Sequence, residues 1–173
     1  MPPPDTRWWH LILTARGQWL PGDPRGFRSR RHRIHSSGDY KHHPPADEHQ
    51  DLFRYHKRHA APPVTFPVPV RELLGRALQT KTKALKLQCL CLAVGPSHAH
   101  MLLRGPADFD ETRKIVGRLK QAASHAVRSD LPGRIWADGG KPIPIRDREH
   151  QLRVFRYILK HENEGAWVWR FDA

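Results

Sequence analysis

Cysteine and long apolar runs are both scarce in this chain. Its 173 residues include 2 cysteines, Cys89 and Cys91, so no second pair exists to build a zinc site or a disulfide framework. We expect both thiols to be buried and reduced on one face of a strand, where a spacing of two residues makes a poor disulfide. No apolar run is long enough to cross a bilayer, and the start MPPPDTRWWH lacks the charged-then-apolar order of a secretory signal. These absences predict a cytoplasmic protein without a membrane partner.

Acidic residues are also in the minority. The chain has 17 Asp and Glu against 30 Lys and Arg, which gives a formal net charge of +13 and a pI near 10.5. A hydrophobic fraction of 38% with 6 Trp and 6 Phe is too apolar for a disordered chain, and the length fits a single domain over residues 1–173. A charge of this size and sign is typical of a protein with a polyanionic partner, and a surface that serves only solubility is the alternative.

The apolar patterning predicts an alternation of strands and helices. Strands are expected at 8–15, 84–94 and 98–103, and a short one follows the irregular stretch IWADGGKPIPIRD. Helices are expected at 46–59, from Val68 onward, behind a capping box formed by Asp108 and Glu111, and at 148–165. The Arg- and His-rich residues 28–45 predict an exposed, mobile, basic loop. The order of the elements predicts an α+β, ferredoxin-like sandwich, with helices on one face of an antiparallel sheet.

The stretch VGPSHAHMLLRG places His98 and His100 one residue apart, just after a Gly-Pro turn. In a chain with 13 histidines, about one such pair is expected by chance, so the spacing alone decides nothing. Alternate residues of a strand share a face, so the two imidazoles would lie side by side while Ala99 and Met101 pack beneath helices. Neutral imidazoles at this spacing can bind one divalent cation. A pair of ordinary hydrogen-bonded histidines on a sheet is the alternative.

The last expected helix adds a hydroxyl and a further imidazole. Tyr157 and His161 lie one turn apart, so their side chains can reach the same point in space. They fall on a different arc from the predicted core face, which consists of Leu152, Phe155, Ile158 and Leu159. This places a tyrosine beside a candidate third metal ligand, and a surface Tyr-His pair is the alternative. The rival tyrosines are Tyr40 and Tyr55. His10 on the first strand could approach the same site, although a structural role is favoured for it.

Three stretches, in this order, resemble the single-tyrosine HUH transposases, whose relatives include the REP-associated tyrosine transposases of bacteria. WWHLILTARGQWLPGDPRG resembles the opening strand and Trp-Leu-x-Gly-Asp-x-Arg-Gly turn of that family. AVGPSHAHMLL resembles its motif of two histidines flanking one residue, and WADGGKPIPIRDREHQLRVFRYILKHENEGAWVW resembles the closing region with the nucleophilic tyrosine. The resemblance covers most of the chain and implies the same ferredoxin-like fold. The chain departs from the family at Ser97, where many relatives carry Asn.

The resemblance implies a role for each of these residues. His98 and His100 would bind a divalent metal, Mg²⁺ or Mn²⁺, and His161 lies where relatives carry a polar residue that completes the coordination. Tyr157 would be the nucleophile. The implied reaction is metal-dependent cleavage and rejoining of single-stranded DNA at hairpin-flanked ends, through a 5′-phosphotyrosine intermediate. A homodimer stays open, because some relatives place the tyrosine of one subunit against the histidines of the other.

Binding of single-stranded DNA with hairpins requires further cations and stacking surfaces. The basic residues expected to neutralise phosphates, besides the loop at 28–45, are Arg71, Arg76, Arg118 and Lys120. The candidates for stacking on unpaired bases are Trp19, Trp136, Trp167 and Trp169, although tryptophans more often fill cores.

Two other functions stay open on the residues alone. One is a non-catalytic, domesticated module that binds DNA or RNA hairpins on the same fold. The other is a small metal-binding protein that happens to be basic. The preferred location is the bacterial cytoplasm, in association with the nucleoid.

Overall fold

The computed structural model of this chain describes residues 5–27, 35–38 and 42–172. Tyr40 and much of the predicted basic loop at 28–45 lie outside these residues. The chain forms two compact units, one from residues 1–16 with 64–173 and the other from residues 17–63.

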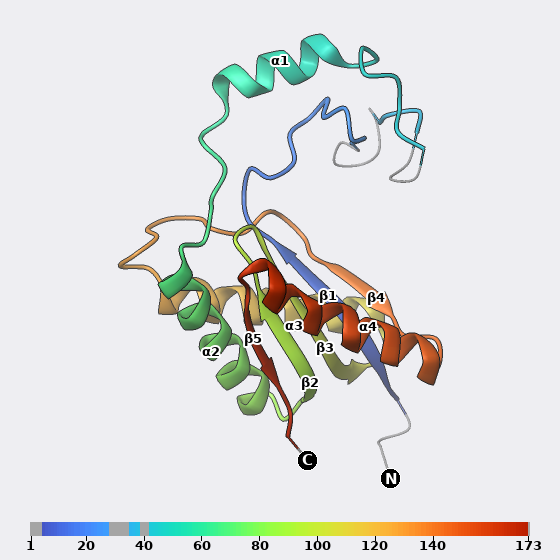
Figure 1. Cartoon of the computed structure of the whole chain (residues 1–173), viewed down its shortest axis with the longest axis vertical. Coiled ribbons are helices and arrows are strands. Elements are labelled where there is room, and N and C mark those ends of the chain that lie inside the picture. Colours follow the sequence, from blue (N-terminus) through green and yellow to red (C-terminus); the bar gives the residue numbers. More distant parts are fainter. Residues whose placement is uncertain (1–4, 28–34, 39–41, 173) are drawn as a thin grey trace. The chain divides into compact units, whose positions relative to one another are not determined.

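The larger unit is built on a five-stranded antiparallel sheet with the order β4-β1-β3-β2-β5 (Figure 1). The strands are β1 (Thr6–Thr14), β2 (Gln88–Val94), β3 (His98–Pro106), β4 (Lys141–Pro144) and β5 (Trp167–Arg170). Strand β3 is central and pairs with β1 on one side and β2 on the other. The predicted α+β, ferredoxin-like fold is confirmed, except that the helices do not all lie on one face: the last helix packs on the opposite side of the sheet, because both faces of its central strands carry buried apolar residues.

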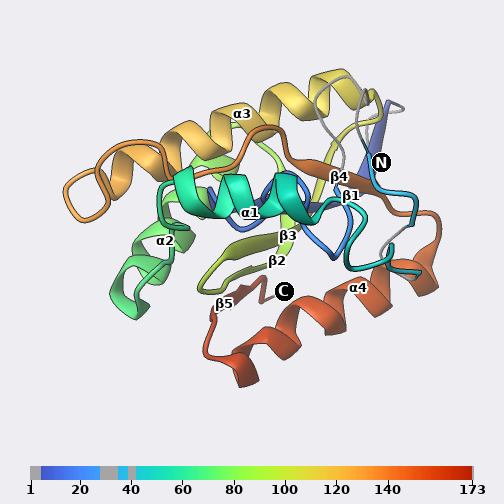
Figure 2. The ribbon, with the colours of Figure 1, turned by 90° about the horizontal axis from the view of Figure 1, so that it is seen from above.

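Helices α2 (Val68–Ala84) and α3 (Phe109–Ala126) cover one face of this sheet (Figure 2). Alternate residues of the strands supply the apolar surface beneath them, with Leu11 and Leu13 from β1 and Met101 and Leu103 from β3 fully buried. The predicted cap of α3 is present, because the Asp108 side chain accepts a hydrogen bond from the backbone N–H of Glu111 at 2.8 Å.

Helix α4 (Arg148–Lys160) lies on the opposite face of the sheet and continues into a 3₁₀ turn, His161–Glu164 (Figure 2). Its buried residues are Gln151, Val154 and Ile158. The predicted core face is therefore partly wrong, since Leu152 is 38% exposed. The prediction took the most apolar side of α4 as its core face. In the structure the neighbouring side of the helix contacts the sheet, so the polar Gln151 is buried and Leu152 faces solvent.

The two cysteines lie on opposite faces of the sheet rather than on one. The register of β2 against β3 shifts between Cys89 and Cys91. This bulge sends Cys89 to the core under α2 and α3, and Cys91 to the core under α4. Both thiols are free. The prediction that they share a face fails because a bulge inserts an extra residue and breaks the simple alternation along a strand.

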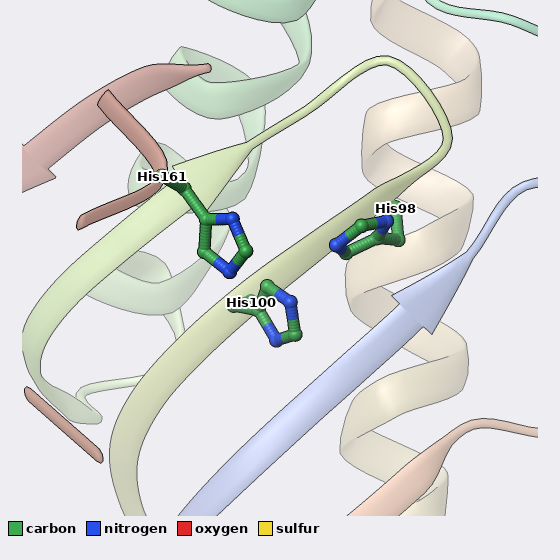
Figure 3. Close-up of side chains that lie close together, drawn as sticks. All are labelled: His98, His100 and His161. Atoms are coloured by element: carbon green, nitrogen blue, oxygen red, sulfur yellow. The ribbon is translucent and has the colours of Figure 1, made fainter. Parts of the chain in front are cut away.

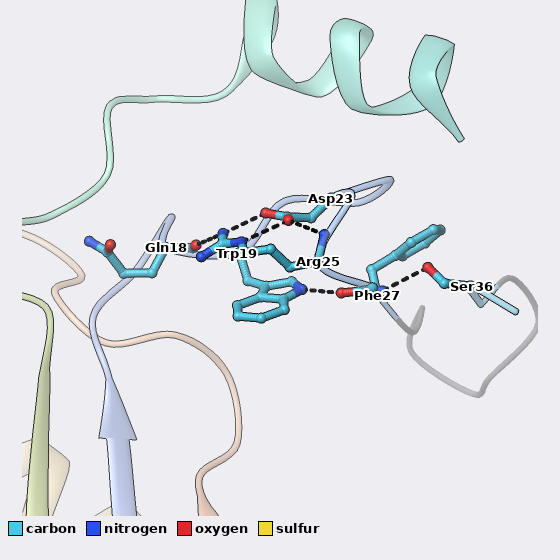
Figure 4. A network of polar contacts seen from close by, with 7 residues as sticks. Gln18, Trp19, Asp23, Arg25, Phe27 and Ser36 are labelled. Carbon is cyan, nitrogen blue, oxygen red and sulfur yellow. Dashed lines mark hydrogen bonds and ion pairs between the residues drawn. The ribbon is translucent and has the colours of Figure 1, made fainter. Parts of the chain in front are cut away.

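The smaller unit contains helix α1 (Gln50–His59) and a turn held together by Asp23 (Figure 4). The Asp23 carboxylate forms an ion pair with Arg25 at 2.6 Å. The guanidinium of Arg25 lies 4.1 Å from the ring centroid of Trp19, whose indole N–H donates to the carbonyl of Gly26. Asp-Pro-Arg-Gly is thus a defined turn. Among the described residues of the whole chain, no helix has both the length and the apolarity needed to cross a membrane.

Candidate active site

Three imidazoles converge on the α4 face of the larger unit (Figure 3). His98 and His100 project from the same face of β3, and His161 stands at the point where α4 becomes a 3₁₀ turn. One ring nitrogen from each histidine lies within 4.8 Å of those of the other two. The ring centroids of His100 and His161 are 4.7 Å apart, and the rings are nearly parallel. The structure therefore brings together the three residues that the sequence singled out as metal ligands.

A hydrogen bond occupies the Nδ1 atom of each imidazole. The Nδ1 atom of His100 is 2.9 Å from Nε2 of His10, and that of His98 is 3.0 Å from Oγ of Ser97. The Nδ1 atom of His161 is 2.9 Å from a carboxylate oxygen of Glu164. Such contacts fix the orientation and tautomer of a metal-binding histidine, and they leave Nε2 to act as the ligand. Ser97, where the chain departs from the family, thus still supplies a polar contact.

The remaining ring nitrogens suit a cation. Within the part of the chain that the structure describes, the Nε2 atoms of His100 and His161 are buried without a hydrogen-bond partner. A buried nitrogen in this state costs about 1–3 kcal/mol, which a bound ion would offset. Burial, together with the neighbouring His98, His10 and His161, lowers the pKa of His100 to about 2. Burial also lowers the pKa of His98. Both rings are therefore neutral near pH 7 and can offer a lone pair without first losing a proton.

Tyr157 stands at the edge of this cluster. Its ring centroid lies 5.3 Å from that of His100 and 4.9 Å from that of His161, and the side chain is 48% exposed. Partial burial and the nearby Glu164 raise the pKa of the phenol above its usual value. The hydroxyl is therefore protonated near neutral pH, on a side chain that is about half exposed.

Glu164 is a contact that sequence reasoning missed, and His10, for which a structural role was favoured, lies in contact with His100. His10 is buried, and burial, with contributions from His150, His161 and Lys141, lowers its pKa to about 4. Strand β1 pairs His10 with Leu102, which brings it beside His100. Only the register of β1 against β3 reveals this contact, and only the 3₁₀ turn brings Glu164 back onto His161.

Tyr55 in α1 shows that the Tyr-His spacing alone is not distinctive. Its ring lies 4.4 Å from that of His59, also one turn away, and it is 59% exposed. In the described residues, however, the only group of metal-ligating side chains is the one formed by His98, His100 and His161. The convergence of imidazoles therefore distinguishes Tyr157 from Tyr55.

The basic residues expected to contact DNA lie on α2 and α3, across the sheet from this cluster. They are Arg71, Arg76, Arg118 and Lys120. Arg71 donates to the carbonyl of Gly165 at 2.6 Å, and Arg76 forms an ion pair with Glu72 at 2.7 Å. Lys120 donates to the carbonyl of Ala137 at 2.8 Å, and burial lowers its pKa. Arg118 is exposed. Three of the four side chains therefore have partners within the protein.

The candidate stacking tryptophans differ in their exposure. Trp136 is 4% exposed and packs against Phe66 in the core, which removes it from consideration as a base platform. Trp167 and Trp169 are half-buried on β5. Trp19 is 51% exposed, but the guanidinium of Arg25 covers one of its faces.

The fold resembles that of a known class of DNA-processing protein. No protein-family model matches the chain, and no curated protein matches it in sequence. In structure it is similar to a REP-associated tyrosine transposase solved in complex with a REP hairpin, with a TM-score of 0.51 and 14% sequence identity. The similarity covers 93% of this chain and 70% of the transposase chain. The resemblance expected from the sequence is thus confirmed at the level of the fold.

Proposed function

We propose that residues 1–173 act as one metal-dependent transposase domain that cleaves and rejoins single-stranded DNA at hairpin-flanked ends. The observation that carries this proposal is the half-exposed hydroxyl-bearing ring of Tyr157 beside three converging imidazoles. A nucleophilic oxygen next to a cation site is a combination that suits phosphoryl transfer to a protein side chain.

In this proposal, the Nε2 atoms of His98, His100 and His161 hold a divalent metal. When bound, the ion would polarise the scissile phosphate and stabilise the charge on its oxygens. The resemblance to the HUH family suggests Mg²⁺ or Mn²⁺. Three imidazole donors favour Mn²⁺ or another transition ion over Mg²⁺, which prefers oxygen ligands.

The proposed chemistry exchanges one phosphoester for another. The Tyr157 oxygen attacks a backbone phosphorus, a new Tyr O–P bond forms, and the P–O3′ bond breaks. The phenol proton is released, and the departing 3′ oxygen takes up a proton to become a free 3′-OH. The other strand end stays on the protein as a 5′-phosphotyrosine. A 3′-OH can later attack that phosphorus. The O3′–P bond then forms, the Tyr O–P bond breaks, and the tyrosine oxygen takes up a proton. The strands thus rejoin without water or a nucleoside triphosphate.

Hairpin DNA is the proposed substrate. The similar transposase was solved with a REP hairpin, and the net charge of +13 suits a polyanion. The 5.3 Å separation between the rings of Tyr157 and His100 supports attack by the tyrosine on a phosphate held at the histidines of the same chain. A homodimer is not required for this arrangement.

A labelling experiment tests the proposal. Single-stranded DNA carrying the hairpins that flank the gene, labelled at its 3′ end, is incubated with protein and Mn²⁺ or Mg²⁺. The wild type should form a metal-dependent covalent protein–DNA band, because the 5′-phosphotyrosine retains the 3′-labelled fragment. Tyr157→Phe should lose the band and keep DNA binding.

Tyr55→Phe is the matched control, since Tyr55 also stands one turn before a histidine, and it should form the adduct normally. If the wild type binds the hairpins without forming an adduct, the chain is a binding module rather than a transposase. Metal binding without DNA affinity would indicate the small metal-binding protein instead.

A further inference from the structure

An arginine-lined pocket of about 380 Å³ lies at the start of α4, in the larger unit. Arg104 of β3 and two residues that flank the helix start, Arg146 and Arg148, line it together with Arg7. Trp8 and Ile145 form an apolar part of the pocket wall. None of these residues belongs to the set that the sequence suggested for DNA binding.

Two of these arginines, Arg104 and Arg148, are held by neutral side chains and not by carboxylates. Arg104 donates to Oγ1 of Thr6 at 3.0 Å, and Arg148 donates to the side-chain oxygen of the buried Gln151 at 2.6 Å. Within the described residues, no acidic side chain forms an ion pair with any arginine of the pocket. Their positive charge is therefore available to a ligand.

The single acid in the pocket has another role. The Asp147 carboxylate accepts a hydrogen bond from the backbone N–H of His150 at 2.7 Å and so caps α4. This contact, with smaller contributions from the charges of Arg153 and Arg146, holds the pKa of Asp147 below its usual value. One carboxylate, already hydrogen-bonded, leaves the pocket with a net positive charge.

A larger pocket of about 730 Å³ beside α3 shows the opposite arrangement. Arg113 lies 3.7 Å from Asp110, and Arg134 forms an ion pair with Asp138. Both arginines of this pocket are therefore paired with carboxylates of the protein. The comparison singles out the pocket at α4 as a place where an anion would meet unpaired guanidinium groups.

The arginine pocket and the imidazole cluster share one face of the sheet. Arg104 follows His100 by four residues on β3, so it projects from the same face at a distance of ~13 Å along the strand. Arg148 precedes Tyr157 by nine residues on α4, which gives ~14 Å along the helix. Strand β3 thus leads from the imidazole cluster, and α4 from the candidate nucleophile, to the arginines over a similar distance.

We propose that this pocket binds a backbone phosphate of the same DNA strand that Tyr157 attacks. This inference rests on the proposed function. Successive phosphates of a stacked strand are about 3.4 Å apart along its axis. The ~13 Å between the imidazole cluster and the pocket therefore corresponds to at most about four nucleotides between the attacked phosphate and the one in the pocket. Planar guanidinium groups bind a phosphate through paired N–H donors, and two of them anchored by Thr6 and Gln151 fix its position.

The salt dependence of DNA binding tests the proposal. Binding of a fluorescent, unstructured single strand is measured by anisotropy at several salt concentrations, with Tyr157→Phe as the background so that no covalent product forms. In Arg146→Gln/Arg148→Gln, the slope of log K against log salt should become shallower by about 0.7 for each phosphate that the protein no longer neutralises. The control Arg113→Gln/Arg134→Gln removes the same charge from the α3 pocket and should leave the slope unchanged. Equal thermal midpoints would establish that both variants fold.

Each outcome is informative. If the two double variants give equal salt slopes, the proposed phosphate site is wrong. This holds even if the wild type forms its covalent adduct and the proposed function stands. Titration with inorganic phosphate provides a second arm: loss of its binding in Arg146→Gln/Arg148→Gln with unchanged DNA slopes would assign the pocket to a free anion and overturn the proposal. A shallower slope without any wild-type adduct would keep the pocket as a DNA site and reject the transposase chemistry. No DNA binding by any form would overturn both.

Discussion

The Nε2 atom of His10 lies 2.9 Å from the Nδ1 atom of His100, and both imidazoles are buried on one face of the sheet, on the neighbouring strands β1 and β3. A neutral histidine carries one N–H, so a proton on Nδ1 of His100 that is donated to His10 leaves its Nε2 unprotonated. That second nitrogen is the buried atom without a partner in the described residues. When His10 is the acceptor of this hydrogen bond, it holds His100 in the tautomer that can bind a cation.

Replacement of His10 should weaken metal binding. Loss of a partner that orients a ligand typically costs 10–100-fold in affinity, so we expect His10→Ala to bind Mn²⁺ about 10–100-fold more weakly in a calorimetric titration. His10→Gln, whose amide oxygen can accept the same hydrogen bond, should recover part of this affinity. His125→Ala removes an exposed histidine of α3 and should bind normally. An unchanged affinity in a folded His10→Ala protein would contradict the tautomer role.

Metal should also stabilise the fold. At 100 times the dissociation constant, a ligand that binds only the native state contributes about 2.7 kcal/mol, so saturating Mn²⁺ should raise the thermal midpoint and a chelator should reverse the change. His161→Ala should abolish the shift, because the site then keeps only the two imidazoles of β3. A shift of equal size in His161→Ala would place the bound ion elsewhere.

Local patterns predicted much of the site. The two-residue period of β3 put His98 and His100 on one face, and one helical turn put Tyr157 beside His161. The cap at Asp108 was equally visible, since it depends on residues three apart.

Contacts between distant segments could not be predicted in this way. His10 reaches His100 only through the register of two strands, and the arginine pocket combines β3 with the residues around the start of α4. The faces of Cys91 and Leu152 were misjudged for a related reason. The position of a bulge depends on how neighbouring strands pair, and the buried side of a helix depends on how it packs on the sheet. The spacing of apolar residues along the chain determines neither.

The cysteines should be unreactive in the folded protein. Burial raises the pKa of Cys89 to about 12, and it also raises that of Cys91. Since the thiolate is the reactive form, a disulfide reagent at pH 8 should modify neither residue until guanidinium unfolds the chain, after which both should react. Rapid modification of native protein would show that the bulge in β2 opens readily. The absence of a cross-link between the two residues, checked by mass spectrometry after mild oxidation, tests their placement on opposite faces.

Gly75 and Gly117 provide a matched pair for the packing of α2 and α3. A Cβ atom at Gly75 would lie 2.1 Å from the ring of Trp167, whereas one at Gly117 would meet nothing within 4 Å among the described residues. Alanine favours a helix over glycine by about 1 kcal/mol, so Gly117→Ala should raise the free energy of unfolding by up to that amount. At Gly75 the clash should outweigh this gain, because overpacking of a core costs roughly 1–3 kcal/mol. Denaturant titrations check both values.

In a Trp167→Val background the ring is absent, and Gly75→Ala should then behave like Gly117→Ala. If Gly75→Ala destabilises the two backgrounds equally, the contact between α2 and β5 is not the cause.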